Sequence, residues 1–220
     1  MKQVYICGDS FSVTDPEYGP CWVDILQEKL KDTATLIPLS RVCASNLLIS
    51  LQVDKAITAA DFIICHLTSS TREEAQLKRQ TIEKDLFYRF KQNELTVYSI
   101  HSLTRTMPQF NKEQLAIVKT YQSEFFDLEL SIYKNQCIIE NILQKLKNSK
   151  IPFLFDQGGF EHPSMGATCK YFNNFDQYRS SINLWDYSAT RDYRPYYHIR
   201  DSSTHQIIAD YYFNQIQLIL

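Results

Sequence analysis

The chain has 220 residues and a net charge of −2, from 23 Lys and Arg against 25 Asp and Glu, so it has no basic excess to hold a nucleic acid backbone. Its length suits a single domain (1-220), and no repeat or change of composition divides it. The chain enters an apolar strand almost at once and has no apolar run long enough to span a membrane, which predicts a soluble, cytoplasmic protein without a signal peptide.

Short apolar runs alternate with amphipathic stretches, which predicts strands and helices that follow one another along the chain. The expected strands are Gln3–Cys7, Ala34–Pro38, Phe62–Leu67, Ile151–Phe155 and Ile182–Trp185. The expected helices are 21–31, 46–57, 112–147 as one long helix or two in line, and a closing helix that Asp201, Ser202 or Ser203 caps. This order predicts an α/β fold, a flavodoxin-like three-layer α/β/α sandwich around a parallel sheet of about five strands.

The cysteines give no sign of a metal site or a disulfide framework. They form no CxxC pair and no cluster with histidine, and two of them lie inside apolar runs. The six are Cys7, Cys21, Cys43, Cys65, Cys137 and Cys169. We expect reduced thiols, no metal and no cofactor.

The first expected strand ends in a turn that carries an alcohol. In "VYICGDSFS", the apolar residues stop at Cys7, and Gly8, Asp9 and Ser10 follow, which are turn formers. A serine at the carboxyl end of a strand lies where α/β sheets usually bind their ligands, although the same triplet could serve only to lead the chain into a helix.

Four stretches together resemble the blocks of the SGNH/GDSL hydrolase superfamily. They are "GDSFS" after the first strand, "SRVCASNLLI" after the second, "ADFIICHLTSSTRE" ending the third, and a histidine shortly before the last helix. The whole chain also resembles members of this superfamily that marine bacteriophages encode. The resemblance implies that Ser10 is the nucleophile of an acyl transfer, for which it needs an imidazole to take its proton.

Two of the five histidines are candidates for that base, His198 and His205. Counted back from the closing helix, His198 falls where the family places its base, whereas His205 would lie on the helix itself. His66 and His101 lie in strand-like segments, which is typical of structural histidines. The family's orienting acid would fall at Pro195, so Asp192 is the first candidate for that role, and Asp186 and Asp201 remain alternatives.

The resemblance also implies an oxyanion hole built by the Ser10 N–H, a glycine N–H and an asparagine side chain. Cys43 stands at the glycine position, and Asn46, which could otherwise cap a helix, follows it. Thr68 or Ser69 stands where the asparagine would be, and a hydroxyl can also donate a hydrogen bond. The expected substrate-binding residues are Asp9, Arg72 and Tyr197, with a surface ion pair as the alternative role of the arginine.

These features predict an esterase or O-deacetylase that removes a small acyl group from a carbohydrate or other polar carrier, through an acyl-serine intermediate. Because the second and third blocks depart from the family pattern, the alternative is an inactive binding module of the same fold for a glycan or another small polar ligand. A nucleotide- or flavin-binding protein is disfavoured, because the first loop has no glycine-rich cradle.

Overall fold

The computed structural model gives the fold of the chain and the surroundings of the serine turn. The residues that the structure describes are 1–13, 20–42, 44–69, 72, 74–75, 89–92, 95–99, 112–156, 158, 180–182, 184–187, 198–199 and 201–220.

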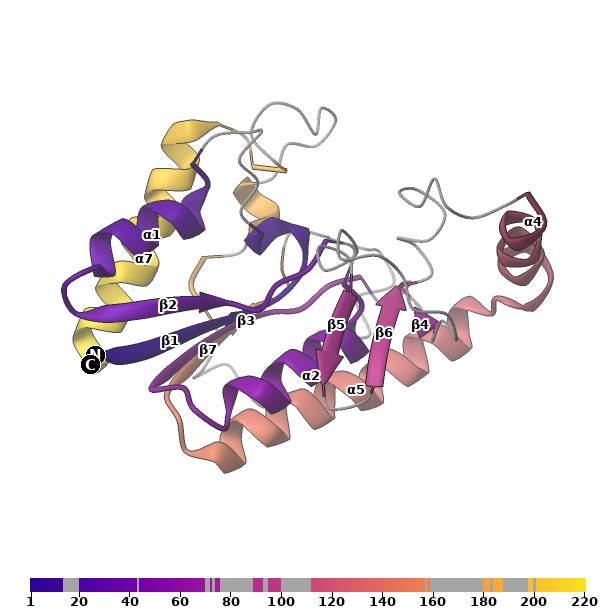
Figure 1. Cartoon of the computed structure of the whole chain (residues 1–220), viewed down its shortest axis with the longest axis horizontal. Helices are drawn as coiled ribbons and strands as arrows, with labels where there is room; N and C mark the ends of the chain where they lie inside the picture. Colours follow the sequence, from indigo (N-terminus) through magenta and orange to yellow (C-terminus); the bar gives the residue numbers. More distant parts are fainter. Residues whose placement is uncertain are drawn as a thin grey trace.

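The centre of the fold is a parallel sheet with the strand order β2-β1-β3-β7 (Figure 1). Its strands are β1 (Lys2–Cys7), β2 (Ala34–Pro38), β3 (Phe62–His66) and β7 (Phe153–Asp156). From β1 the chain passes to β2 on one side and then returns to β3 on the other side. The carboxyl ends of β1 and β3 therefore meet at the point where the strand order reverses, which is where open α/β sheets bind ligands.

Helices cover both faces of this sheet (Figure 1). One face carries α1 (Trp22–Leu30) and α7 (Ser202–Ile219), and the other carries α2 (Asn46–Ala56) and α5 (Leu128–Ser149). Alternate side chains of β1 enter the two cores: Val4 and Ile6 pack with the first pair of helices, and Tyr5 and Cys7 with the second. The expected three-layer α/β/α sandwich is confirmed.

Side-chain caps explain where several helices begin. Asp201 accepts the Thr204 N–H at the start of α7, as the sequence predicts, and Ser45 accepts the Leu48 N–H at the start of α2. Asp127 caps α5 in the same way.

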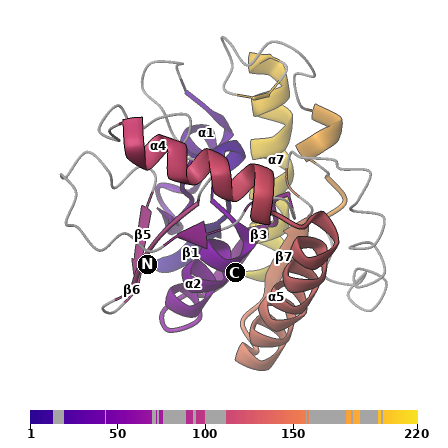
Figure 2. The same cartoon turned by 90° about the vertical axis from the view of Figure 1, so that its right-hand side faces the viewer.

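The cap at Asp127 also corrects the expected helix 112–147. The chain forms α4 (Lys112–Thr120) and a π-helical turn, η4 (Tyr121–Phe125), and then two extended residues before α5 begins. Figure 2 shows that α4 crosses the direction of α5, so the two helices are not in line. The extended backbone of Phe126 and Asp127 breaks the helix at this point.

The fifth expected strand, Ile182–Trp185, is also wrong. Beside β7, the Ser180 N–H donates to the Phe155 carbonyl (2.8 Å), and the Ser180 hydroxyl then accepts the Ile182 N–H (3.2 Å). A side chain that takes a backbone N–H competes with strand pairing, and the 3-10 helix η7 (Leu184–Tyr187) follows. The central sheet therefore has four strands among the described residues.

A small antiparallel sheet, with the order β4-β6-β5, accompanies the sandwich and was not expected from the sequence. Its strands are β4 (Glu74–Ala75), β5 (Arg89–Gln92) and β6 (Leu95–Ser99). The hairpin of β5 and β6 contacts α2 (Figure 1).

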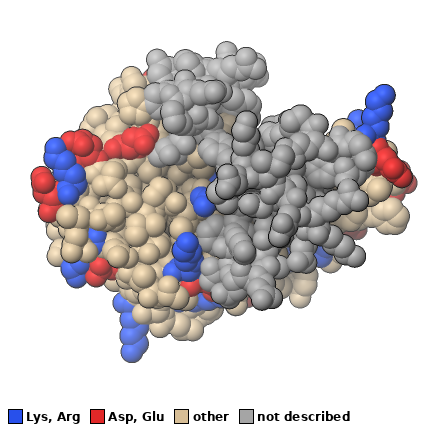
Figure 3. Space-filling model, viewed as in Figure 1, with Lys and Arg blue, Asp and Glu red and all other residues tan. Residues whose placement is uncertain are grey.

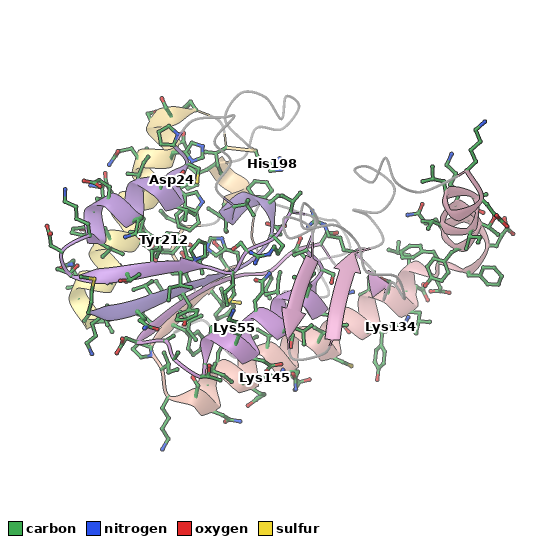
Figure 4. The ribbon with its side chains drawn as sticks, in the orientation of Figure 1. Asp24, Lys55, Lys134, Lys145, His198 and Tyr212 are labelled. Atoms are coloured by element: carbon green, nitrogen blue, oxygen red, sulfur yellow. The ribbon has the colours of Figure 1, made fainter. Side chains whose placement is uncertain are left out.

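Charges of both signs are interspersed over the described part of the face in Figure 3, and ion pairs join neighbouring helices. Lys29 of α1 contacts Asp210 of α7 (2.7 Å), and Lys145 of α5, which Figure 4 labels, contacts Asp54 of α2 (2.7 Å). Within the described segments, no helix combines the length and the apolar character that crossing a bilayer requires.

Four of the cysteines lie in described segments and carry free thiols, as expected. Burial raises the pKa of the Cys7 and Cys65 thiols well above the usual value, and that of Cys21 to about 12. These three thiols are therefore held as neutral, unreactive core groups. Cys137 is exposed, and Cys43 and Cys169 lie outside the described residues.

Candidate active site

The turn after β1 is a single 3-10 turn, η1 (Ser10–Ser12), that Asp9 caps. One carboxylate oxygen of Asp9 accepts the Phe11 N–H (3.1 Å), and the Asp9 carbonyl accepts the Ser12 N–H (3.1 Å). Ser10 is the first residue of the turn, where a backbone N–H has no partner inside the helix. The arrangement fixes Ser10 at the carboxyl end of β1 with its N–H left over for another acceptor.

The second carboxylate oxygen of Asp9, Oδ2, is also occupied. It accepts the Thr68 hydroxyl (2.6 Å) and Nη1 of Arg72 (3.2 Å), and the same guanidinium nitrogen donates to the Ala44 carbonyl (2.8 Å). Asp9 and Arg72 form a buried ion pair, with side chains 0 % and 7 % exposed. The ion pair fixes the serine turn to the segment after β3, and because it is buried, the surface ion pair expected as an alternative for Arg72 is wrong. The expected contact of Asp9 and Arg72 with a substrate stays a prediction.

Asn46 has no amide hydrogen left for a substrate oxygen. Its amide donates to the Thr68 carbonyl (3.0 Å) and to Oδ1 of Asn135 (2.9 Å), and its oxygen accepts the Thr68 N–H (2.9 Å). The capping role at the start of α2 belongs to Ser45. Asn46 therefore ties the segment after β3 to α2 and α5.

The same contacts use the hydroxyl of Thr68, one of the two hydroxyls expected in the oxyanion hole. The hydroxyl hydrogen of Thr68 goes to Asp9 and its N–H goes to Asn46, so Thr68 has no donor left. Ser69 follows it and is 5 % exposed. The oxyanion role expected of Ser69 stays a prediction.

His198 lies next to the serine turn. Its ring stacks on that of Phe11, the residue after Ser10, with the ring centroids 4.9 Å apart and the planes 24° apart. Figure 4 shows His198 near the start of α7. Its backbone has a φ of 72°, a strained value for a residue other than glycine. In the described part of the chain, no hydrogen bond joins its ring to the Ser10 hydroxyl.

His205 serves the packing of two helices. Its Nδ1 accepts the backbone N–H of Trp22 (3.0 Å), the first residue of α1, and 3 % of the histidine is exposed. The His205 ring, in the first turn of α7, is thus the hydrogen-bond acceptor for an N–H at the start of α1.

Of the three candidates for the orienting acid, only Asp201 has a side chain that the structure describes. Oδ1 of Asp201 accepts the Ser203 hydroxyl (2.7 Å), the Thr204 N–H (2.7 Å) and the Thr204 hydroxyl (2.8 Å), so Asp201 is engaged in capping α7. Asp192, Tyr197 and Cys43 lie outside the described residues, as does the side chain of Asp186.

His66 is a hydrogen-bonded structural residue, as expected, but one of its partners lies in the serine turn, which the sequence did not predict. This partner is Ser12, two residues from Ser10. Nδ1 of His66 lies 3.0 Å from the Ser12 hydroxyl, and Nε2 lies 3.1 Å from the hydroxyl of Tyr212. The available indication was that Ser12 and His66 both lie near the carboxyl ends of strands that the alternating pattern predicts to be parallel neighbours.

Burial lowers the pKa of His66 from 6.5 to about 3. Between these values the unfolded chain binds a proton that the folded chain does not, so this group makes the folded state less stable as the pH falls. We expect this group to lower the free energy of unfolding by on the order of 1 kcal/mol per pH unit between about pH 6 and pH 4.

Urea unfolding at several pH values measures this loss. The free energy of unfolding of the wild type should fall with acid more steeply than that of His66→Asn, by about one proton taken up on unfolding. Parallel slopes for the two proteins would show that His66 titrates normally in the fold.

Within the described residues, no group of three or more His, Cys, Asp or Glu side chains could hold a metal ion.

No protein-family model matches the chain, and no curated protein matches its sequence. Solved structures are similar to it over their whole length. The acetyl xylan esterase AlAXEase is 14% identical with a TM-score of 0.51, covering 97% of this chain and 99% of its own. The psychrotrophic esterase EstA from Pseudoalteromonas sp. is 11% identical with a TM-score of 0.51 (99% and 98% covered), and TesA is 11% identical with a TM-score of 0.50 (100% of both). With this coverage, the chain shares its overall fold with these three proteins.

Proposed function

We propose that the protein is a serine ester hydrolase in which Ser10 is the nucleophile and His198 is the general base. The observation that carries this proposal is the stacking of His198 on Phe11, which brings a histidine from the segment before α7 to the serine turn at the end of β1. This turn lies at the reversal of the strand order, where the fold favours a ligand site.

The proposed reaction begins when the His198 imidazole takes the Ser10 hydroxyl proton as the oxygen attacks the ester carbonyl. The Ser10 N–H, the Ser69 hydroxyl and the Cys43 N–H are the proposed donors to the oxyanion. The alcohol leaves with the proton from His198, and water then releases the acyl group from Ser10. Asp192 remains the proposed orienting acid. Apo enzymes often close the serine–histidine hydrogen bond only when substrate is bound.

Asp9, Arg72, Thr68 and Asn46 have a supporting role in this proposal. Their contacts fix the serine turn to the ends of β1 and β3, and they are buried and paired with one another. A nucleophile needs this rigidity, because a displacement of about 1 Å can cost about a hundredfold in rate.

The proposed substrate is a small O-acyl group, such as acetyl, on a carbohydrate or other polar carrier. The similarity to AlAXEase, an acetyl xylan esterase, supports this class. Tyr197 remains a proposed contact for the carrier.

Fluorophosphonate labelling tests the proposal. The reagent reacts with an activated serine, and mass spectrometry of the digested protein should place the adduct on Ser10. Because Ser10 is 2 % exposed, labelling also tests whether a substrate can reach it. Ser10→Ala should remain unlabelled. A folded wild-type protein that stays unlabelled over a range of pH would instead indicate the inactive binding module.

A further inference from the structure

A buried chain of hydrogen bonds starts at Ser12, the residue that closes the serine turn. The Ser12 hydroxyl contacts Nδ1 of His66 (3.0 Å), Nε2 of His66 contacts the Tyr212 hydroxyl (3.1 Å), and this hydroxyl donates to Oδ2 of Asp156 (3.4 Å). The four residues come from the serine turn, β3, α7 and β7. Ser12 and His66 are 0 % exposed.

The Asp156 carboxylate determines the direction of the hydrogen bonds. Its Oδ1 accepts the Gly158 N–H (2.7 Å), and its Oδ2 accepts the Tyr212 hydroxyl hydrogen. The Tyr212 oxygen can then accept a hydrogen from Nε2 of His66, which leaves Nδ1 to accept the Ser12 hydroxyl hydrogen. This order uses every donor once and needs a neutral imidazole, consistent with the low pKa of His66.

Packing holds the His66 ring in this orientation. The indole of Trp22 stacks on it, with the centroids 5.4 Å apart and the planes 12° apart. Gly8, which follows β1, lets the backbone of this strand end lie close to His66 and Ser12. A Cβ at this position would lie 3.2 Å from both the His66 Cβ and the Ser12 hydroxyl oxygen. The ring therefore has little room to move, and neither has the hydroxyl that it holds.

We propose that His66 is a positioning residue for Ser10, because its neutral imidazole anchors Ser12 and thereby fixes the turn that presents the nucleophile. This inference rests on the proposed function of Ser10. Ser12 and His66 have the contacts of a serine–histidine pair, but their complete burial leaves no path for an acyl group, so they support the site and are not a second one.

Ser12→Ala, with Ser50→Ala as a matched control, tests the proposal. Ser50 is also a buried serine with a side-chain partner, Lys145, but it lies on α2. Both variants should lose a few degrees of melting temperature. Ser12→Ala alone should lower kcat for p-nitrophenyl acetate by about tenfold or more at nearly unchanged KM, because the turn is displaced and binding is not.

A second pair of variants separates positioning from packing. The Asn side chain in His66→Asn can place its oxygen near the position of Nδ1 and accept the Ser12 hydroxyl, whereas His66→Ala cannot. We expect His66→Asn to recover most of the kcat that His66→Ala loses, and His66→Ala to speed amide hydrogen exchange at Phe11 and Ser12.

Equal kcat values for Ser12→Ala and Ser50→Ala, or equal losses in His66→Asn and His66→Ala, would overturn the proposal. The exchange rates also keep it separate from the proposed function. If the wild type neither hydrolyses esters nor labels at Ser10, the proposed function fails, while faster exchange in His66→Ala would still support the anchoring of the turn and unchanged exchange would refute it.

Discussion

Ser10→Ala is expected to lower the turnover of p-nitrophenyl acetate by about a thousandfold or more, because the acyl-enzyme cannot form without the hydroxyl. What remains would come from the oxyanion donors and from binding alone. Initial rates under saturating substrate measure the effect.

The stability of the variant is the control for this experiment. Among the described residues, no hydrogen bond uses the Ser10 hydroxyl, so its removal should change the melting temperature little. If Ser10→Ala is folded and keeps wild-type turnover, another group is the nucleophile and the proposed mechanism is wrong.

His198→Ala should also abolish esterase activity, with a loss of about a thousandfold or more, since the serine would then lack its base. Its melting temperature should fall less than that of a core variant, because His198 is only partly buried and its stacking on Phe11 is worth about 0.5 to 1.5 kcal/mol. Parallel measurements of turnover and thermal unfolding give both values.

His205→Ala is the matched control for His198→Ala, and it should behave in the opposite way. It leaves the Trp22 N–H without its acceptor in a buried contact between α1 and α7, which costs about 1 to 3 kcal/mol. The melting temperature should fall by several degrees, while most of the activity remains. A folded but inactive His205→Ala together with an active His198→Ala would reverse the assignment of the base.

Local patterns in the sequence determined the framework of this protein. The alternation of short apolar runs with amphipathic stretches predicted the four parallel strands of the central sheet and the helices between them, because each of these elements has one buried side or two. The turn formers after the first strand located the serine turn, and the cap at Asp201 located the start of α7. These features depend on residues that are neighbours in the chain.

The sequence pattern did not predict where one helix ends or why one apolar run is not a strand. The periodic stretch 112–147 does not show where a helix stops, since the break at Phe126 and Asp127 lies inside a run with helical spacing. In the same way, the apolar residues of Ile182–Trp185 suit a strand, but the Ser180 side chain takes the backbone N–H that pairing needs.

Only the tertiary structure decided the roles of the polar residues around Ser10. The sequence offered Asp9 as a substrate contact and Thr68 as an oxyanion donor, and only the fold showed that Asp9 accepts hydrogen bonds from both Thr68 and Arg72. The sequence indicated only that Ser12 and His66 lie near the ends of neighbouring strands, and the fold was needed to show that they are in contact. A hydrogen bond uses up its donor, and these bonds join residues 54 to 63 positions apart, so the sequence named the groups but only the fold showed which of them remain available for chemistry.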